Sequence, residues 1–154
     1  MNTVFIRITK LLDEHQVKYL IKDHLPTRTS EESALHRDEP LKIGAKAMLL
    51  KIDTGFVMAV LPADKKIDSA LLKKVLSSKS LRFATPEELK EITGLVPGSV
   101  PPFGALFNIP MLVDKSLLEE EYVAFNAGSL EKSIKMKTSD YVKIAQPALV
   151  SFIK

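Results

Sequence analysis

The chain has 154 residues, which is enough for one domain around a single hydrophobic core. Apolar residues make up 45% of the sequence and charged residues 27%, as in ordinary globular proteins, and the net charge of +3 permits an anionic partner without requiring one. The absence of cysteine excludes disulfides and cysteine-ligated metal sites.

The N-terminal residues Met1–Lys10 contain no long apolar run, because Arg7 and Lys10 interrupt them. This pattern argues against a signal peptide. No segment of the sequence approaches the roughly 18 consecutive apolar residues that a membrane helix requires. We therefore expect a cytoplasmic, soluble protein without a membrane partner.

Apolar periodicity and turn residues divide the chain into short helices and strands. In chain order, the first half is predicted to contain an amphipathic helix over 3–16, a strand over 17–23, a short helix over 30–36, a strand pair over 45–52 and 56–61 joined by a tight turn, a helix over 69–76 and a strand over 81–84. The predicted N-caps are Thr29 or Ser30, Asp68 and Thr85.

The second half continues with short elements in irregular order. The patterns predict a helix over 86–93 that ends at Gly94, strands over 105–107 and 111–113, a helical turn over 114–118, strands over 121–126 and 132–136, a helix ending at 144 and capped within 138–140, and a strand over 149–153. This order indicates a mixed sheet or barrel with helices around it, rather than a regular parallel βαβ fold.

One loop, Gly94–Gly104, has an unusual composition, with three glycines, three prolines and no charge. Proline fixes φ and removes an N–H donor, whereas glycine reaches backbone angles that other residues avoid. Such a loop can be a rigid surface turn. It can also present backbone N–H groups to a ligand carbonyl or phosphate.

Common catalytic motifs are absent. The sequence contains neither a G-x-S-x-G nucleophile elbow nor a G-x-x-x-x-G-K-[ST] phosphate loop. The three histidines, His15, His24 and His36, do not share a metal-ligand spacing. We therefore predict no metal and no cofactor.

Basic residues concentrate between Lys42 and Lys90, where ten basic residues stand against five acidic ones, a local excess of +5. This segment is either a solvated surface or a surface that attracts a polyanion such as RNA. Lys46 differs from the others because it begins the most apolar predicted strand. It is either an edge residue that prevents aggregation or an inward cation that needs an anionic partner.

Several segments together resemble the YbaK/ProX family of aminoacyl-tRNA deacylases, which is related to the editing domain of bacterial prolyl-tRNA synthetases. The resemblance extends from about Tyr19 to Ile144 and rests on the order and spacing of His24-x-Pro26, Thr29–Ala34, Gly44-Ala45-Lys46, Ala59–Asp64, Leu81–Leu89, Gly98–Gly104, Val113–Leu117 and Ala127–Ser129. It implies one compact α/β domain over residues 1–154, with a mixed, mostly antiparallel, barrel-like sheet surrounded by helices.

The resemblance also implies a function and a site. The expected reaction is hydrolysis, in trans, of the ester that joins a wrong amino acid to tRNA. The expected partners are the tRNA acceptor end and, as a further candidate, an aminoacyl-tRNA synthetase. By this resemblance, the catalytic residues are Lys46, Gly98 and Pro102, and the substrate-binding residues are His24, Ala47, Ser99, Val100, Pro101, Phe103, Gly104, Asn126, Gly128 and Ser129.

Two positions depart from the family pattern, and both are expected to border the amino acid. Ala47 follows the lysine where relatives often have a polar residue, and Asn126 stands where some relatives have histidine. Ala, Cys, Ser and Thr esters are therefore all candidate substrates. The competing functions are a non-catalytic module that binds tRNA or a synthetase, and a hydrolase of small-molecule esters.

Overall fold

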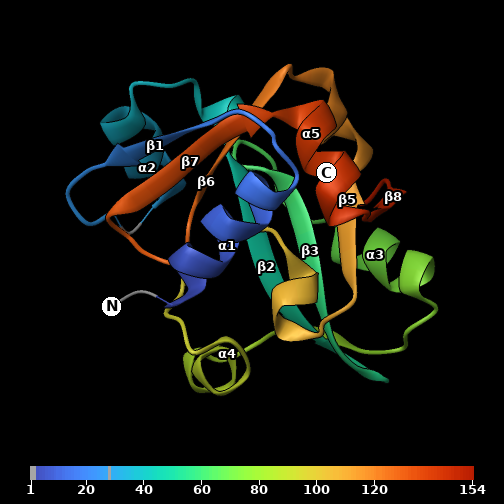
Figure 1. Cartoon of the computed structure of the whole chain (residues 1–154). Coiled ribbons are helices and arrows are strands. Elements are labelled where there is room, and N and C mark those ends of the chain that lie inside the picture. Colours follow the sequence, from blue (N-terminus) through green and yellow to red (C-terminus); the bar gives the residue numbers. More distant parts are fainter. Residues whose placement is uncertain (1–2, 28) are drawn as a thin grey trace.

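The strands form two sheets in the computed structural model, which describes residues 3–27 and 29–154 (Figure 1). One sheet has three antiparallel strands in the order β1-β7-β6, and the other has five strands in the order β4-β2-β3-β5-β8. The strands are β1 (Tyr19–Asp23), β2 (Ala45–Ile52), β3 (Gly55–Pro62), β4 (Leu81–Phe83), β5 (Met111–Asp114), β6 (Tyr122–Asn126), β7 (Lys132–Lys137) and β8 (Ala148–Val150).

The helices are short, and they lie around the sheets (Figure 1). None of those in the described residues is long and apolar enough to span a membrane. The α-helices are α1 (Thr3–Glu14), α2 (Ser30–Arg37), α3 (Ser69–Leu76), α4 (Pro86–Thr93) and α5 (Thr138–Ala145), and the 3₁₀ helices are η1 (Leu41–Ile43), η2 (Gly104–Phe107) and η3 (Lys115–Glu119).

The predicted hairpin of β2 and β3 and the mixed, mostly antiparallel character of the sheet are confirmed, but the predicted barrel-like closure is wrong. Four ladders, β1–β7, β6–β7, β2–β3 and β2–β4, are antiparallel, whereas β3–β5 and β5–β8 are parallel. The two sheets meet at a bridge between Gly44 and Ala124. A barrel needs every edge strand to pair, and β1, β4 and β8 have no ladder on their outer sides within the described residues.

The strand β3 connects two hydrophobic cores because its side chains alternate between the two faces of the sheet. Met58 and Val60 pack in the larger core, together with α1, β6, β7 and Tyr141. Val57, Ala59 and Leu61 pack in a smaller core, which α3 closes with Leu72. Both faces of β3 are thus buried, which explains its continuous apolar sequence.

Two local predictions in the second half are wrong. Residues 105–107 form part of η2 instead of a strand. Asn108 adopts a left-handed backbone conformation, and its N–H donates to the carbonyl oxygens of Gly104 and Ala105, which ends a helical turn. Thr138 begins α5 instead of capping it, and Lys137 occupies the N-cap without a side-chain hydrogen bond. The predicted caps Thr29, Asp68 and Thr85 are confirmed.

The hydroxyl of Thr138 is buried and has no hydrogen-bond partner within the described residues. An unpaired buried hydroxyl costs about 1–3 kcal/mol. We therefore expect Thr138→Val to leave the free energy of unfolding unchanged or to raise it by about 1 kcal/mol, as measured by urea denaturation. The matched control is Thr93→Val, since the buried Thr93 hydroxyl donates to the Leu89 carbonyl over 2.7 Å, and this variant should lose about 1 kcal/mol. Equal destabilisation of both variants would contradict the prediction.

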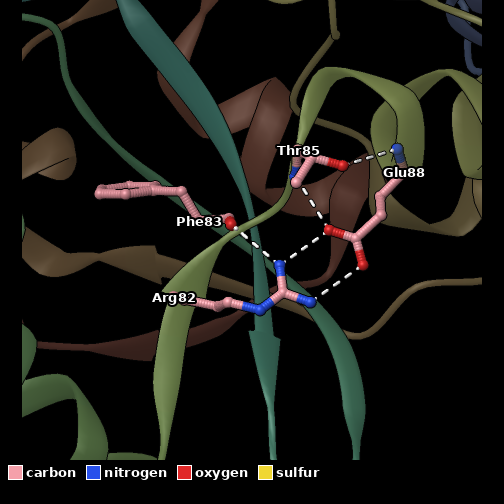
Figure 2. Close-up of polar contacts among 4 residues, drawn as sticks. All are labelled: Arg82, Phe83, Thr85 and Glu88. Carbon is pink, nitrogen blue, oxygen red and sulfur yellow. Dashed lines mark hydrogen bonds and ion pairs between the residues drawn. The ribbon is translucent and has the colours of Figure 1, made fainter.

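Strand β4 is joined to α4 by a compact polar cluster (Figure 2). The Arg82 guanidinium donates to both carboxylate oxygens of Glu88, over 2.8 and 3.0 Å. Glu88 also accepts from the Thr85 N–H, and the Thr85 hydroxyl accepts from the Glu88 N–H, which completes a capping box. The cluster fixes the start of α4, the helix that leads into the loop Gly94–Gly104.

The hydrogen bonds from Arg82 and then from the Thr85 N–H lower the pKa of Glu88 from 4.5 to about 2. A carboxylate with a lower pKa in the folded state stabilises the fold above its unfolded pKa, and this contribution disappears as the pH falls through the folded pKa. We expect the stability difference between the wild type and Glu88→Gln to be constant at neutral pH and to vanish between about pH 4.5 and 2. Chemical denaturation across this range tests the expectation. Glu87→Gln is the control, because Glu87 makes no polar contact within the described residues, and a wild-type-like profile for Glu88→Gln would refute the assignment.

Candidate active site

A cavity of about 140 Å³ lies where α2, the start of β2, the end of β6 and the loop around Gly98 meet. Its polar lining contains four hydroxyl groups, two cations and one amide, and no carboxylate among the described residues. These polar side chains are Thr27, Thr29, Ser30, Ser33, Arg37, Lys46 and Asn126. A cavity with this lining suits a ligand that carries negative charge or exposed carbonyl oxygens.

Lys46 enters the cavity from the second residue of β2. Its Nζ lies 3.5 Å from the Ala63 carbonyl oxygen, a long contact that leaves the other ammonium protons available. Burial lowers the pKa of Lys46, and the charge of Lys66 adds to this effect, whereas Glu31 and Asp64 oppose it. The lysine is therefore a partly desolvated cation. An anion bound beside its ammonium would favour the protonated, charged form.

Arg37 lies in the last turn of α2, and only 8% of its surface is exposed. Its Nε donates to the Ser133 hydroxyl over 2.8 Å, and its Nη2 donates to the Asn126 amide oxygen over 2.9 Å. The guanidinium makes no ion pair within the described residues. Burial lowers the pKa of Arg37 to about 10, against the opposing charge of Glu39, so the side chain stays charged at neutral pH.

The backbone at Gly98 forms part of the cavity wall. Gly98 has a φ of +88°, and its carbonyl oxygen accepts from the Asn126 amide over 2.6 Å. The N–H groups of Gly98 and Val100 donate no hydrogen bond within the described residues. Unpaired N–H groups at a cavity wall are suitable donors for a developing oxyanion.

The structure brings five of the predicted site residues together around the cavity: Lys46, Ala47, Gly98, Val100 and Asn126. Two others lie in the chain segments beneath it. The Pro102 carbonyl accepts from the buried Tyr141 hydroxyl over 2.6 Å, and the Phe103 ring packs edge-on against Phe125 and Tyr141. Pro102 and Phe103 therefore anchor the loop in the core and do not line the cavity.

The remaining predicted residues also lie outside the cavity lining. The Ser99 carbonyl accepts a hydrogen bond from the Gly128 N–H, and this bond connects the loop to the turn after β6. Ser129 accepts from the Glu131 N–H, and the buried Pro101 and Gly104 continue the loop. His24 contacts Ser133 over 2.7 Å, beside the Arg37 contact. The roles predicted for these residues stay predictions.

Sequence reasoning did not find Arg37 or the hydroxyl groups of the cavity. The available signal was the spacing of Ser30, Ser33, Ala34 and Arg37, which places all four on one face of α2. An arginine in a helix with charged neighbours normally indicates a solvated face, so its burial was not foreseeable. Among the described residues, no group of three or more His, Asp or Glu side chains could hold a metal ion.

The fold and cavity define a class of small α/β domain, in which two cations and residues with backbone N–H groups unpaired within the described part of the chain line one cavity. The chain belongs to the aminoacyl-tRNA editing domain family, whose model matches residues 24–144. It is 34% identical over 151 residues to the multifunctional Ser/Thr-tRNA deacylase ProXp-y of Escherichia coli strain K12, and the match covers 95% of this chain and 90% of that protein.

Two further similarities are consistent with this family. A proline–tRNA ligase of Bacillus licheniformis is 31% identical over 110 residues, which cover 71% of this chain and 19% of the ligase. The solved structure of a protein described as a candidate trans-editing enzyme for prolyl-tRNA synthetase superposes with a TM-score of 0.84 at 21% identity. That superposition covers 100% of this chain and 99% of the other, and it shows the shared fold.

Proposed function

We propose that this protein is an aminoacyl-tRNA deacylase, which hydrolyses the ester of a mischarged tRNA in trans. The observation that carries the proposal is the cavity that Lys46 and the Gly98 loop both line, in a chain that matches a deacylase along most of its length. The ester of an aminoacyl-tRNA is intrinsically labile. Positioning and oxyanion stabilisation can therefore provide the catalysis.

In the proposed reaction, water attacks the ester carbonyl carbon. The N–H groups of Gly98 and Val100 donate to the oxyanion of the tetrahedral intermediate, while the Lys46 ammonium holds an anionic group of the substrate. The bond to the ribose oxygen then breaks, and that oxygen takes a proton that originates from the attacking water. A neighbouring ribose hydroxyl of the tRNA assists this proton transfer, so no side chain acts as the nucleophile.

The proposed amino acids are small and polar, with serine and threonine first. The E. coli relative is named for these two substrates. The cavity is small and has hydroxyl groups from α2 and the Asn126 amide in its lining, all of which can pair with a substrate hydroxyl. Alanyl and cysteinyl esters are also to be assayed as substrates, because a pocket that tolerates one methylene more or less discriminates between two amino acids by only about 10–200-fold.

The proposed partner is the acceptor end of tRNA, bound near the basic segment between Lys42 and Lys90. Lys46 belongs to this segment and lines the cavity, and the nearby charge of Lys66 helps to lower the pKa of Lys46. Association with a synthetase and a cytoplasmic location stay part of the proposal. The match to a proline–tRNA ligase supports the first of these, since it places a related domain within a synthetase.

The decisive experiment uses a panel of seryl-, threonyl-, alanyl- and cysteinyl-tRNA and follows loss of the amino acid. We expect the seryl and threonyl substrates to be deacylated fastest, and the rate at subsaturating tRNA to fall steeply with salt because phosphate contacts release counterions. A protein that binds these tRNAs without deacylating any would be a binding module. Activity on small esters that ignores the tRNA body and salt would indicate a small-molecule hydrolase.

A further inference from the structure

We propose that Arg37 is a positioning residue, which orients the Asn126 amide and, through it, holds the Gly98 carbonyl and the loop N–H groups in place. The inference rests on the proposed deacylase function, and it adds a residue that neither the sequence motifs nor the comparisons identify. Arg37 is distinct from Lys46 because its contacts are directed toward the protein.

The planar guanidinium of Arg37 binds two residues at the same time. Arg37 donates from Nε to Ser133 and from Nη2 to Asn126, so two of its nitrogens bind two different residues. A planar guanidinium can do this with little loss of entropy, whereas a lysine ammonium is a point donor on a flexible stem. The Ser133 hydroxyl lies 3.2 Å from the same Asn126 oxygen. These three residues therefore form a network at the cavity, and His24 extends it through its 2.7 Å contact with the Ser133 hydroxyl.

The Asn126 amide is held in one orientation by hydrogen bonds at both of its ends. Its Oδ1 is near the Arg37 and Ser133 donors, and its Nδ2 is 2.6 Å from the Gly98 carbonyl oxygen. A flipped amide would place an NH₂ group against the Arg37 donor and an oxygen against the Gly98 carbonyl. Both contacts would then be repulsive, so the guanidinium fixes the amide in the one orientation that binds the loop.

The orientation of the Asn126 amide affects the proposed catalysis through the Gly98 backbone. Gly98 holds a φ of +88°, and its carbonyl has no other donor within the described residues. Without the Asn126 bond, only the bond from the Ser99 N–H to the Val96 carbonyl, over 3.2 Å, holds the peptide between Gly98 and Ser99. This peptide lies between the Gly98 and Val100 N–H groups, so a change in its orientation alters how the two groups are placed relative to each other. Oxyanion donors are effective only when they are held in position before the reaction. Loss of Arg37 should therefore reduce kcat much more than it changes KM.

Arg37, although buried, contributes to the lining of two cavities, the one described above and a second of about 240 Å³ beside β1 and β7. Removal of its side chain would leave a space that free guanidinium can enter from solvent. This access makes chemical rescue a suitable test of the proposal.

The experiment is a double-mutant cycle of Arg37→Ala and Asn126→Ala, with kcat and KM for seryl-tRNA measured for each protein. If Arg37 acts through Asn126, each single change should lower kcat about 10–100-fold, and the double change should cost little more than either. Additive losses would overturn the proposal and would indicate that Arg37 contacts the substrate directly. Thermal unfolding of each variant measures whether the fold is retained.

Two further variants distinguish geometry from charge. Arg37→Lys keeps the charge and should stay impaired, whereas millimolar guanidinium should restore Arg37→Ala and should not restore Lys46→Ala. Wild-type activity in the same assay separates a failure of the deacylase function from a failure of this inference.

NMR gives a test that is independent of activity, since Arg37→Lys should shift the resonances of the Asn126 side-chain amide and of the Ser99 backbone amide. Unchanged resonances at both positions would also overturn the proposal.

Discussion

Replacement of Lys46 by alanine is expected to lower kcat/KM for deacylation by about 10²–10³-fold, the usual effect of losing one preorganised charge or donor. The ammonium lines the cavity, and its contact to Ala63 is long, so its main partner is expected to be the substrate. The matched control is Lys143→Ala. The exposed Lys143 lies in α5, outside both the cavity and the basic segment between Lys42 and Lys90.

The charge of Lys46 gives the same prediction a pH dependence. Burial lowers the pKa of Lys46, and the charged form exists below that pKa. If the ammonium holds the substrate, enzymatic deacylation, corrected for spontaneous ester hydrolysis, should fall as the pH rises through this lowered pKa. Lys46→Arg should remove this decline, because an arginine stays charged. A Lys46→Ala enzyme with wild-type kcat/KM, or a pH profile that Lys46→Arg leaves unchanged, would contradict the assignment.

The sequence predicted which segments contribute to the site better than it predicted how their residues are arranged. The apolar run after Lys46 and the Gly–Pro composition of residues 94–104 indicated a lysine and a backbone-rich loop, and the structure places parts of both at one cavity. Periodicity could not show that Pro102 and Phe103 face the core. That depends on Tyr141, almost forty residues later, whose hydroxyl bonds the Pro102 carbonyl.

The fold shows the same division between local and long-range information. N-caps such as Thr85 and the hairpin of β2 and β3 depend on neighbouring residues, and these predictions were confirmed. Closure of the sheet depends on which distant edges pair, and it was predicted wrongly. The burial of Arg37 belongs to the same class, because its partners Asn126 and Ser133 come from the other end of the chain.

Replacement of Gly98 by alanine is expected to lower kcat about 10–100-fold, with a small effect on the fold. A side chain at a φ of +88° costs about 1–2 kcal/mol, whereas the added Cβ would meet only Leu130, at 3.4 Å. The loop can relieve this strain by rotating the peptide whose carbonyl binds Asn126, which changes the relative placement of the flanking Gly98 and Val100 N–H groups proposed for the oxyanion. The expected loss is therefore in catalysis as well as in stability.

Gly94→Ala provides the matched control for this strain. Gly94 has a φ of +76° at the end of α4, and a Cβ there would contact nothing within 4 Å. Both variants should lose a similar free energy of unfolding in urea, since both place alanine in the left-handed region. Only Gly98→Ala should lose kcat per folded molecule. Equal activity of the two variants would mean that the Gly98 backbone does not position the reacting groups, and the oxyanion donors would then have to lie elsewhere in the cavity.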